Sequence, residues 1–447
     1  KKGKHMLTFI KKIVIHQKKD YLLLLSILTL IASFEFCFIA MYDHLSRLDL
    51  KIDWMTFRAI AFIPFLTLMI AVVLSVFVAK YFIQNKKHEF SMLLLFGRKP
   101  KDLFLYLIIQ YGIMSLIAFF LGFILGILIM KGINIYLIHI HMNYIFQYHF
   151  LNTFFLYTFF LIFTVIFILA ISAQQFTEID THIIETINHK NMQKVTPYMI
   201  SMSRHDQKRK VPTGQIISSL FTLHIFFYSL YALATDSLFE NKFIYFALFL
   251  ISIASIINTF IPLLFDLFHS TLLHHPLLFN SISSFIDLTN QLVSIANIHS
   301  IVLPTMFIFV LMSGDMSYIT PFIIPCFIMM LIMLLLCFII KYSLYIKSIM
   351  HIYATQYALG YSPSKLFQIS IFKNLLFLIL VIFIPFVYIY SLGDYIITHQ
   401  FLTSQVMYSL ECLYLVLYTL LMIYIILKER HCIKEVINNV KYLNRGE

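Results

Sequence analysis

The sequence predicts an all-α protein, a polytopic membrane helix bundle with about ten transmembrane helices. Of its 447 residues, 60% are hydrophobic and 12% are charged, about half the charged fraction of a typical water-soluble domain. Its longest apolar runs exceed 20 residues, which is enough for a helix to cross a hydrocarbon core of roughly 30 Å and about twice the length of a membrane β-strand. The composition therefore excludes a soluble globular domain, and the run lengths exclude a β-barrel.

Ten apolar segments are candidate spans. Their approximate ranges are 21–42, 57–83, 103–130, 151–173, 215–235, 243–268, 296–313, 319–345, 367–391 and 402–427. The seventh segment is the weakest candidate, because Asn297, His299 and Asp315 bracket it and Pro304 interrupts it.

The basic residues predict how the chain is oriented. The net charge is +12, but Lys and Arg lie between the apolar runs rather than in one continuous stripe, so we expect no nucleic-acid partner. If the N-terminus is inside, 28 of the 33 Lys and Arg residues fall in inner segments and 5 in outer ones. This distribution satisfies the positive-inside rule and predicts a multi-pass cell-membrane protein with both termini in the cytoplasm.

Two matching segments indicate an internal repeat. The sequence FSMLLLFGRKPKDLF at 90–104 aligns without a gap with YATQYALGYSPSKLF at 353–367, an offset of 263 positions. The identities at the turn are Gly97 with Gly360 and Pro100 with Pro363. Each segment follows one long span and leads into another, so its context supports the match.

The repeat divides the chain into three parts. Spans one to four (1–195) and seven to ten (281–447) form equivalent halves, and spans five and six (196–280) join them. Because the joining spans are even in number, the two halves are expected to be parallel in the membrane. Each half opens with apolar residues at helical spacing, which predict a helix on the inner membrane surface. These residues are Leu7, Ile10 and Val14 in the first half and Phe285, Leu288, Leu292 and Ile295 in the second.

Each matching segment predicts a short amphipathic helix ended by Gly, a polar turn, and a second helix with Pro in its first turn. We call 86–102 the first coupling segment and 349–365 the second, because a rigid protrusion at the cytoplasmic end of a span can accept force from a soluble subunit. The candidate contact residues are Glu89, Phe90, Leu94, Gly97, Arg98 and Lys101 in the first segment and Tyr357, Gly360, Tyr361 and Lys365 in the second. A positive-inside role explains Arg98 and Lys101 equally well.

The first half resembles a known family. The run KKHEFSMLLLFGRKPKDLFLYLIIQYG, followed by the small-residue pattern GFILG at 122–126, looks like the FtsX-like permease domain of ABC transporters. Two such domains in one chain with ten spans resemble the BceB-like antimicrobial-peptide resistance permeases of low-GC Gram-positive bacteria. The chain lacks the large extracellular domain of that branch, since the outer segment between spans seven and eight is short. The second copy also departs from the first, with Ile352, Pro385 and Ile389 in place of Glu89, Gly122 and Gly126.

The resemblance implies the permease subunit of an ABC transporter. The chain has no GxxxxGK[ST] loop for a nucleotide phosphate. We therefore expect it to be no enzyme and to bind no cofactor, with ATP and Mg on a separate ATP-binding subunit, present in two copies for two coupling segments. The ligand would be an amphiphilic peptide or lipid-linked molecule drawn from membrane lipid, in antimicrobial-peptide resistance. A sensor kinase or an accessory membrane subunit is a further partner to consider.

Two other classes of function remain open. One is a non-transporting membrane scaffold or sensory partner of a histidine kinase. The other is a secondary transporter, which a parallel repeat permits, although no span shows the paired broken helices and central acid cluster of such proteins. A Walker-motif protein in the neighbouring reading frame would favour the ABC interpretation.

Glu35 and Glu411 are acidic residues in the outer halves of spans one and ten. Because an unpartnered carboxylate in a membrane costs several kcal/mol, each predicts either a cleft for a cationic ligand or a structural hydrogen bond to a neighbouring helix. Gly122 and Gly126 form a GxxxG pair, which predicts close helix packing.

Disulfide and metal chemistry have weak support. The five Cys fall in or beside apolar runs and none forms a CxxC pair, so we expect no disulfide framework or metal finger. His139, His141 and His149 share a predicted outer loop, where an interfacial belt of polar rings is favoured over a metal site.

Overall fold

The computed structural model describes residues 18–45, 65, 68–83, 100–139, 145–181, 213–235, 274–311, 320–398 and 403–445, with isolated positions between 245 and 263. Every regular element within these ranges is helical, which confirms the predicted all-α membrane bundle. The described helices form two compact units, one before residue 208 and one after residue 209, which we call unit 1 and unit 2.

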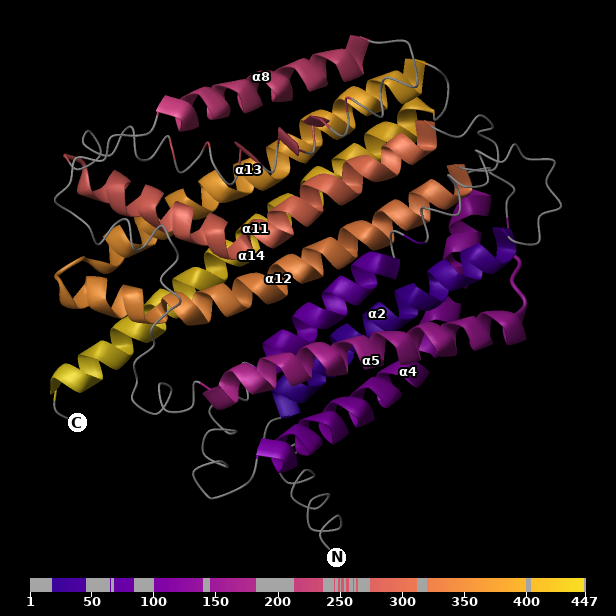
Figure 1. Ribbon diagram of the computed structural model, residues 1–447, viewed down its shortest axis with the longest axis horizontal. Helices are drawn as coiled ribbons and strands as arrows, with labels where there is room; N and C mark the ends of the chain where they lie inside the picture. Colours follow the sequence, from indigo (N-terminus) through magenta and orange to yellow (C-terminus); the bar gives the residue numbers. More distant parts are fainter. Residues whose placement is uncertain are drawn as a thin grey trace, which may run out of the picture. The chain divides into compact units, whose positions relative to one another are not determined.

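Unit 1 contains α2 (Lys18–Leu45), a helix at 68–83, α4 (Pro100–His139) and α5 (Phe150–Thr181), seen in Figure 1. α4 begins at Pro100, where the missing N–H costs no helical bond, and Asp102 adds a favourable acid to the first turn. α2 packs most extensively on α4, and both helices also contact α5.

Two glycines let α2 and α4 approach closely. A Cβ added at Gly122 would lie 2.6 Å from the Cβ of Ala32, and one at Gly126 would lie 2.7 Å from the ring of Phe36. The predicted packing role of this pair is therefore confirmed. The opposite face of α4 carries exposed apolar residues suited to lipid, namely Leu116, Phe120, Ile124 and Leu128.

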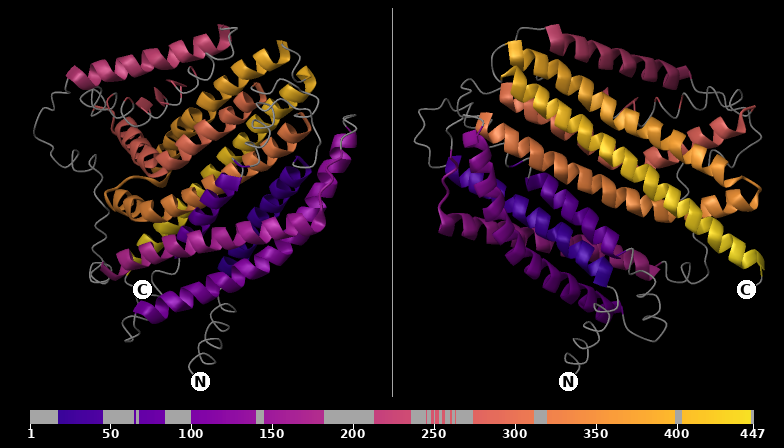
Figure 2. Two further views of the ribbon diagram at one scale, coloured as in Figure 1. Left: turned by 45° about the vertical axis from the view of Figure 1, so that its right-hand side comes forward. Right: turned by 180° about the vertical axis from the view of Figure 1, so that it is seen from behind.

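Unit 2 contains α8 (Thr213–Thr235), α11 (Pro276–Leu311), α12 (Thr320–Ala358), α13 (Pro363–Thr398) and α14 (Ser404–Arg445). α11 packs most extensively on α13, α14 contacts α12 and α13, and α8 contacts α13. Figure 1 and both views of Figure 2 show α11 to α14 lying side by side.

The packing order recurs in the two units. In each, the first helix of the predicted repeat packs most extensively on the third, α2 on α4 and α11 on α13, and the third contacts the fourth. This recurrence supports the internal repeat. The division of the chain into three parts stays a prediction. In the structure α8, which belongs to the predicted linker, is part of unit 2 and contacts α13.

Five described helices are long and apolar enough to cross a membrane. They are Tyr21–His44, Ile108–His139, Pro321–Ile346, Pro363–Val387 and Ser404–Asn438. Shorter apolar helices at 68–83, 150–166 and 216–229 fall on three further predicted spans. Much of 243–268 lies outside the described residues, so the count of ten spans and the cytoplasmic termini stay predictions.

One interpretation of the sequence needs correction. Residues 285–295 are not a separate surface helix: they belong to α11, and their apolar side chains are buried in unit 2, where α11 contacts α12 and α13. Their helical spacing thus reflects packing on protein. Lys373 lies inside α13 and is also buried. The equivalent segment at 7–14 lies outside the described residues.

Candidate coupling site

The turn between α12 and α13 is the part of the coupling segments that the structure describes. α12 ends at Ala358, and Gly360 has a φ of 95°, the left-handed conformation typical of a glycine that ends a helix. The Gly360 N–H donates to the Tyr357 carbonyl at 3.0 Å, and the Tyr361 N–H donates to the Gln356 carbonyl at 3.1 Å. These two bonds form a Schellman motif, which satisfies carbonyl groups at the end of α12.

α13 begins directly after this turn. Pro363 is its first residue, and Ser362 precedes it as the N-cap. The Leu366 N–H donates to the Ser362 carbonyl at 3.1 Å, and the Lys365 N–H makes a long bond of 3.4 Å to the Ser362 hydroxyl. Since only 359–362 connect two capped helices, the turn is a short and well-defined protrusion.

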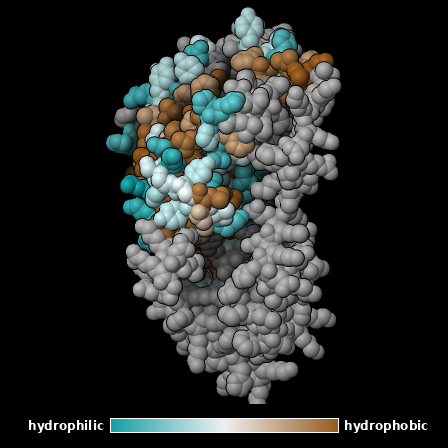
Figure 3. All heavy atoms as spheres, turned by 90° about the vertical axis from the view of Figure 1, so that its left-hand side faces the viewer, coloured by the Kyte–Doolittle hydropathy of each residue, from teal (hydrophilic) through white to brown (hydrophobic). Residues whose placement is uncertain are grey.

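The tip of the turn is exposed. Leu359 is 74% exposed, Gly360 and Lys365 are also exposed, and Tyr361 is half-buried. The Tyr361 hydroxyl accepts a hydrogen bond of 2.6 Å from the Asn280 amide of α11. Figure 3 views the side of unit 2 on which the turn lies and shows hydrophilic and hydrophobic residues mixed over the coloured surface. Such a mixed surface suits contact with protein or lipid headgroups better than with hydrocarbon tails.

A buried cation lies next to the second coupling segment. Lys373 is 1% exposed, and its Nζ lies 2.5 Å from Glu429 Oε1, 2.8 Å from the Tyr353 hydroxyl and 3.3 Å from the Tyr345 hydroxyl. Because an ammonium group has three N–H donors, these three oxygens can satisfy all of them. The Nζ also lies 5.0 Å and 5.2 Å from the ring centres of Tyr345 and Tyr353, within cation–π range.

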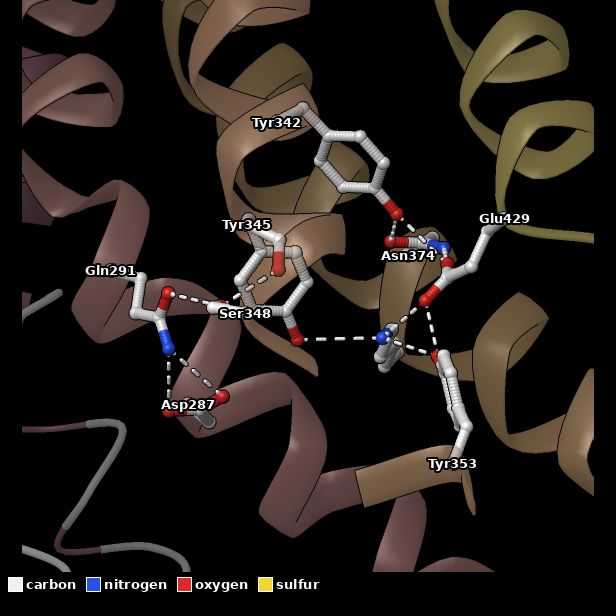
Figure 4. A network of polar contacts seen from close by, with 9 residues as sticks. Asp287, Gln291, Tyr342, Tyr345, Ser348, Tyr353, Asn374 and Glu429 are labelled. Carbon is white, nitrogen blue, oxygen red and sulfur yellow. Dashed lines mark hydrogen bonds and ion pairs between the residues drawn. The ribbon is translucent and has the colours of Figure 1, made fainter. Parts of the chain in front are cut away.

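Glu429 of α14 supplies the opposite charge and is 0% exposed. Oε1 accepts hydrogen bonds from Lys373 and Tyr353, while Oε2 accepts one from the Asn374 amide and lies 2.8 Å from the Tyr342 hydroxyl. Figure 4 shows Tyr342, Asn374 and Tyr353 converging on this carboxylate. Burial and the charge of Glu429 raise the pKa of Tyr353, so its hydroxyl stays protonated and remains a donor. The fully partnered ion pair therefore fixes α12, α13 and α14 to one another.

A smaller polar chain connects α11 with α12. The Gln291 amide donates to the two carboxylate oxygens of Asp287 at 3.2 and 3.3 Å, and the Ser348 hydroxyl donates to the Gln291 amide oxygen at 3.3 Å. Burial raises the pKa of the Asp287 carboxyl, and the Gln291 hydrogen bond partly opposes this shift. Through these contacts all four helices of the second repeat are linked by polar side chains (Figure 4).

α14 continues as a helix beyond the predicted end of its span at 427. The continuation has a buried face at helical spacing, made of Glu429, Cys432, Ile433, Val436 and Ile437. Its other face is exposed and carries Arg430, His431, Lys434 and Glu435. The Arg430 guanidinium lies 5.3 Å from the ring centre of Phe367, near the start of α13. The C-terminal part of α14 thus supports the helices that meet at the coupling turn.

The predicted contact residues are described in part. Tyr357, Gly360, Tyr361 and Lys365 all lie around the α12–α13 turn. Glu89, Phe90, Leu94, Gly97 and Arg98 lie outside the described residues, and Lys101 lies in the first turn of α4 without a described side chain. Pro100 begins α4 as predicted. Contact of either set with an ATP-binding subunit stays a prediction.

The two predicted cleft residues are each buried within their own unit. Glu35 is 2% exposed and lines a cavity in unit 1. Glu411 is 8% exposed, and its Oε1 lies 2.8 Å from the position of a Cβ added at Gly393 of α13. The neighbouring residue Asp394 is exposed and interacts electrostatically with Glu411. A role for Glu35 and Glu411 in ligand binding stays a prediction.

The sequence interpretation overlooks Lys373 and Glu429. One signal points to the first of them: Lys373 and Asn374 interrupt the apolar run of span nine, and the repeat offset of 263 places them opposite Gln110 and Tyr111, which are also polar. No sequence pattern pairs Lys373 with Glu429, because that contact arises from the packing of α13 on α14.

Within the described ranges, no group of three or more His, Cys, Asp or Glu side chains could hold a metal ion. His141 lies outside these ranges. The backbone N–H of His149 donates to Asp43 at 2.7 Å, so this part of the outer loop is attached to the end of α2.

Comparison with known families bears on the first repeat. Residues 61–179 match a family model described as FtsX-like permease C-terminal. The matched region includes the helix at 68–83, the first coupling segment, α4 and most of α5. The match supports a membrane permease component of an ABC transporter, a non-catalytic subunit of a kind that generally works with an ATP-binding subunit. No curated protein matches the chain.

Proposed function

We propose that the protein is the permease subunit of an ABC transporter and is driven by two copies of a separate subunit that binds ATP and Mg. The observation that carries the proposal is the second coupling segment, an exposed turn between two capped helices that a buried ion pair fastens to α14. The family match at 61–179 includes the first coupling segment and supports the same role there.

In this mechanism, force on the α12–α13 turn moves three helices together. A push at Leu359 or Lys365 would act directly on the ends of α12 and α13. Because Lys373 and Tyr353 both bond Glu429, α14 would follow rather than slide past them. Motion produced by ATP binding would thereby reach the outer ends of these helices.

The ligand in this proposal is an amphiphilic peptide or a lipid-linked molecule, as in antimicrobial-peptide resistance. A cationic group on that ligand is supported by two neighbouring acidic residues, Glu411 on α14 and Asp394 on α13. In the described conformation Glu411 is buried. Ligand contact would therefore follow a separation of α13 from α14.

The test substitutes the glycine of each coupling turn. Gly360→Val places a β-branched residue at a φ of 95°, which costs on the order of 1 to 2 kcal/mol locally. A Cβ there meets no atom within 4 Å, so the change acts through the backbone rather than through a clash. We expect normal abundance in the membrane but reduced co-purification of the ATP-binding subunit and reduced ATP hydrolysis. Gly97→Val should be the more damaging, since the family match includes that segment.

Gly360→Asn is the matched control, because Asn adopts the left-handed conformation more readily than other side chains and should retain coupling. Normal co-purification and ATP hydrolysis in the Gly97→Val/Gly360→Val double variant would remove the basis of the mechanism. A scaffold or a secondary transporter gives no reason for either glycine to affect ATP hydrolysis.

A further inference from the structure

Unit 1 has a small, partly open cavity between its helices, with a mainly apolar lining that includes several polar side chains. The cavity has a volume of about 30 Å³, and its polar lining comes from Glu35 of α2, Ser75 of the helix at 68–83, Tyr111 and Ser115 of α4, and Thr164 of α5. A space of this size holds a water molecule and is far too small for an amphiphilic peptide. Its occupant is therefore different from the ligand of the proposed transporter.

The lining gives Glu35 no opposite charge. Among the described residues that line the cavity, none is basic. An ionised carboxylate enclosed in this way would be strongly disfavoured, whereas a protonated carboxyl group can be buried at the cost of an ordinary polar group.

Two of the four hydroxyl groups around the cavity are available as acceptors. The Ser115 hydroxyl donates to the Gly112 carbonyl at 3.0 Å, and the Thr164 hydroxyl donates to the Leu161 carbonyl at 2.8 Å. Because each hydroxyl hydrogen is already used in a bond, the two oxygen atoms can act only as acceptors toward the cavity. These two acceptors can bind a species that brings hydrogen atoms, such as a protonated carboxyl group or water.

One donor in the lining is free within the described structure. The Tyr111 hydroxyl is buried and has no hydrogen-bond partner among the described residues. It can donate to the carboxyl oxygen of Glu35 through a bridging water, which gives a buried water the two to four polar partners that it needs.

We propose that this cavity is a proton-binding site in which Glu35 carries an exchangeable proton and a water molecule bridges it to the Tyr111 hydroxyl. The proton is held while α2, α4 and α5 stay packed, and it is released when their separation lets bulk water reach the carboxyl group. The site is independent of the proposed ABC function.

Among the described residues, few titratable groups lie around Glu35. Tyr111 on α4 and Tyr157 on α5 interact with it electrostatically, and the Tyr157 hydroxyl already donates to the Phe119 carbonyl at 3.1 Å. Cys37 on α2 is buried and donates to the Gly126 carbonyl at 3.6 Å. The helix at 68–83 contributes Ser75, which does not titrate, to the lining. Glu35 is thus the acid that a proton would occupy.

Infrared difference spectroscopy of the full chain in lipid nanodiscs tests the site. At near-neutral pH the wild-type spectrum minus that of Glu35→Gln should contain the C=O stretching band of one protonated carboxyl group. The band should shift in D₂O and disappear as the pH is raised. Tyr111→Phe should shift its frequency without removing it, because only the bridge is lost.

Glu411→Gln is the control and should leave this band unchanged. An Asp variant, Glu35→Asp, replaces Glu35→Gln if the latter does not fold, and it should move the band rather than abolish it. The proposal is overturned if no protonated carboxyl band belongs to Glu35 at near-neutral pH. It is also overturned if exchanging K⁺ for Na⁺ at constant pH converts the band to that of a carboxylate, which would identify a sodium site.

Discussion

Units 1 and 2 hold their helices together by different means. In unit 1, Gly122 and Gly126 let the α4 backbone approach α2 closely. At the equivalent positions, 263 residues later, α13 carries Pro385 and Ile389 instead of glycines, and it still packs extensively on α11. Unit 2 instead joins its helices through a buried ion pair and the polar side chains around it. The helix order has been kept while the chemistry of the contact has changed.

The N-terminal parts of α4 and α13 show a similar contrast. Lys373 and Asn374 are fully engaged with Glu429 and its neighbours. At the equivalent positions, the amide of Gln110 and the hydroxyl of Tyr111 are buried without a hydrogen-bond partner among the described residues. Because a satisfied buried network stiffens its surroundings, we infer that α13 is held more firmly within its unit than α4 is.

The largest effect should follow from breaking the ion pair of unit 2. Glu429→Leu leaves Lys373 buried without its counter-charge and should destabilise unit 2 by about 3–5 kcal/mol. The double variant Lys373→Met/Glu429→Leu removes both charges and should recover most of that loss. Each variant is made in a chain that keeps Cys337, a buried residue of α12, as its one cysteine. Labelling of that thiol by a fluorogenic maleimide on heating then follows the unfolding of unit 2.

The control is the same set of variants in a chain that keeps Cys37 of α2 as its one cysteine. If the ion pair belongs to unit 2 alone, the labelling midpoint of Cys37 should not move. Equal losses at both thiols, or a double variant no more stable than Glu429→Leu, would contradict the contrast between the units.

An intermediate effect is expected from filling the glycine contact of unit 1. Gly122→Ala and Gly126→Ala place a methyl group within 2.6 to 2.7 Å of α2 atoms and should each cost about 1–3 kcal/mol. Gly132→Ala, in the same helix, meets no atom within 4 Å and should be neutral or slightly stabilising. The stability of all three glycine variants is measured by thiol labelling in the chain that keeps Cys37 as its one cysteine. A loss for Gly132→Ala as large as for Gly126→Ala would show that helix propensity, not contact with α2, decides the outcome.

The sequence predicts those features that depend on neighbours along the chain. The apolar runs, the GxxxG pair, the left-handed Gly360 and the first-turn Pro363 are local signals, and the structure has each of them. The ion pair is different in kind. It joins two residues on successive helices that no local sequence pattern relates, and a Lys near the end of a span is also what the positive-inside rule leads one to expect. Likewise, the sequence identifies Glu35 as an acidic residue within a membrane span. It does not predict that hydroxyl groups from three other helices line a cavity beside it.

The smallest effects concern how α13 and α4 begin, where the two units differ in a single hydrogen bond and a single charge. Ser362 caps α13, whereas the aligned residue before α4 is Lys99, which has no acceptor to offer, and α4 has Asp102 in its first turn instead. Ser362→Ala should cost about 0.5–2 kcal/mol of stability, near the low end because the bond to the Lys365 N–H is 3.4 Å long. Hydrogen exchange resolved to single amides by electron-transfer fragmentation should show faster exchange at Lys365 but little change at Leu366, whose N–H donates to the retained Ser362 carbonyl.

Asp102→Asn should have a still smaller effect on stability, of about 0.3–1 kcal/mol. This effect should weaken further at high salt, because a charge near a helix dipole is screened and a neutral cap is not. If the effect of Asp102→Asn on hydrogen exchange were as independent of salt as that of Ser362→Ala, the first turn of α4 would not be stabilised by the charge of Asp102, and the contrast between the two helix starts would be contradicted.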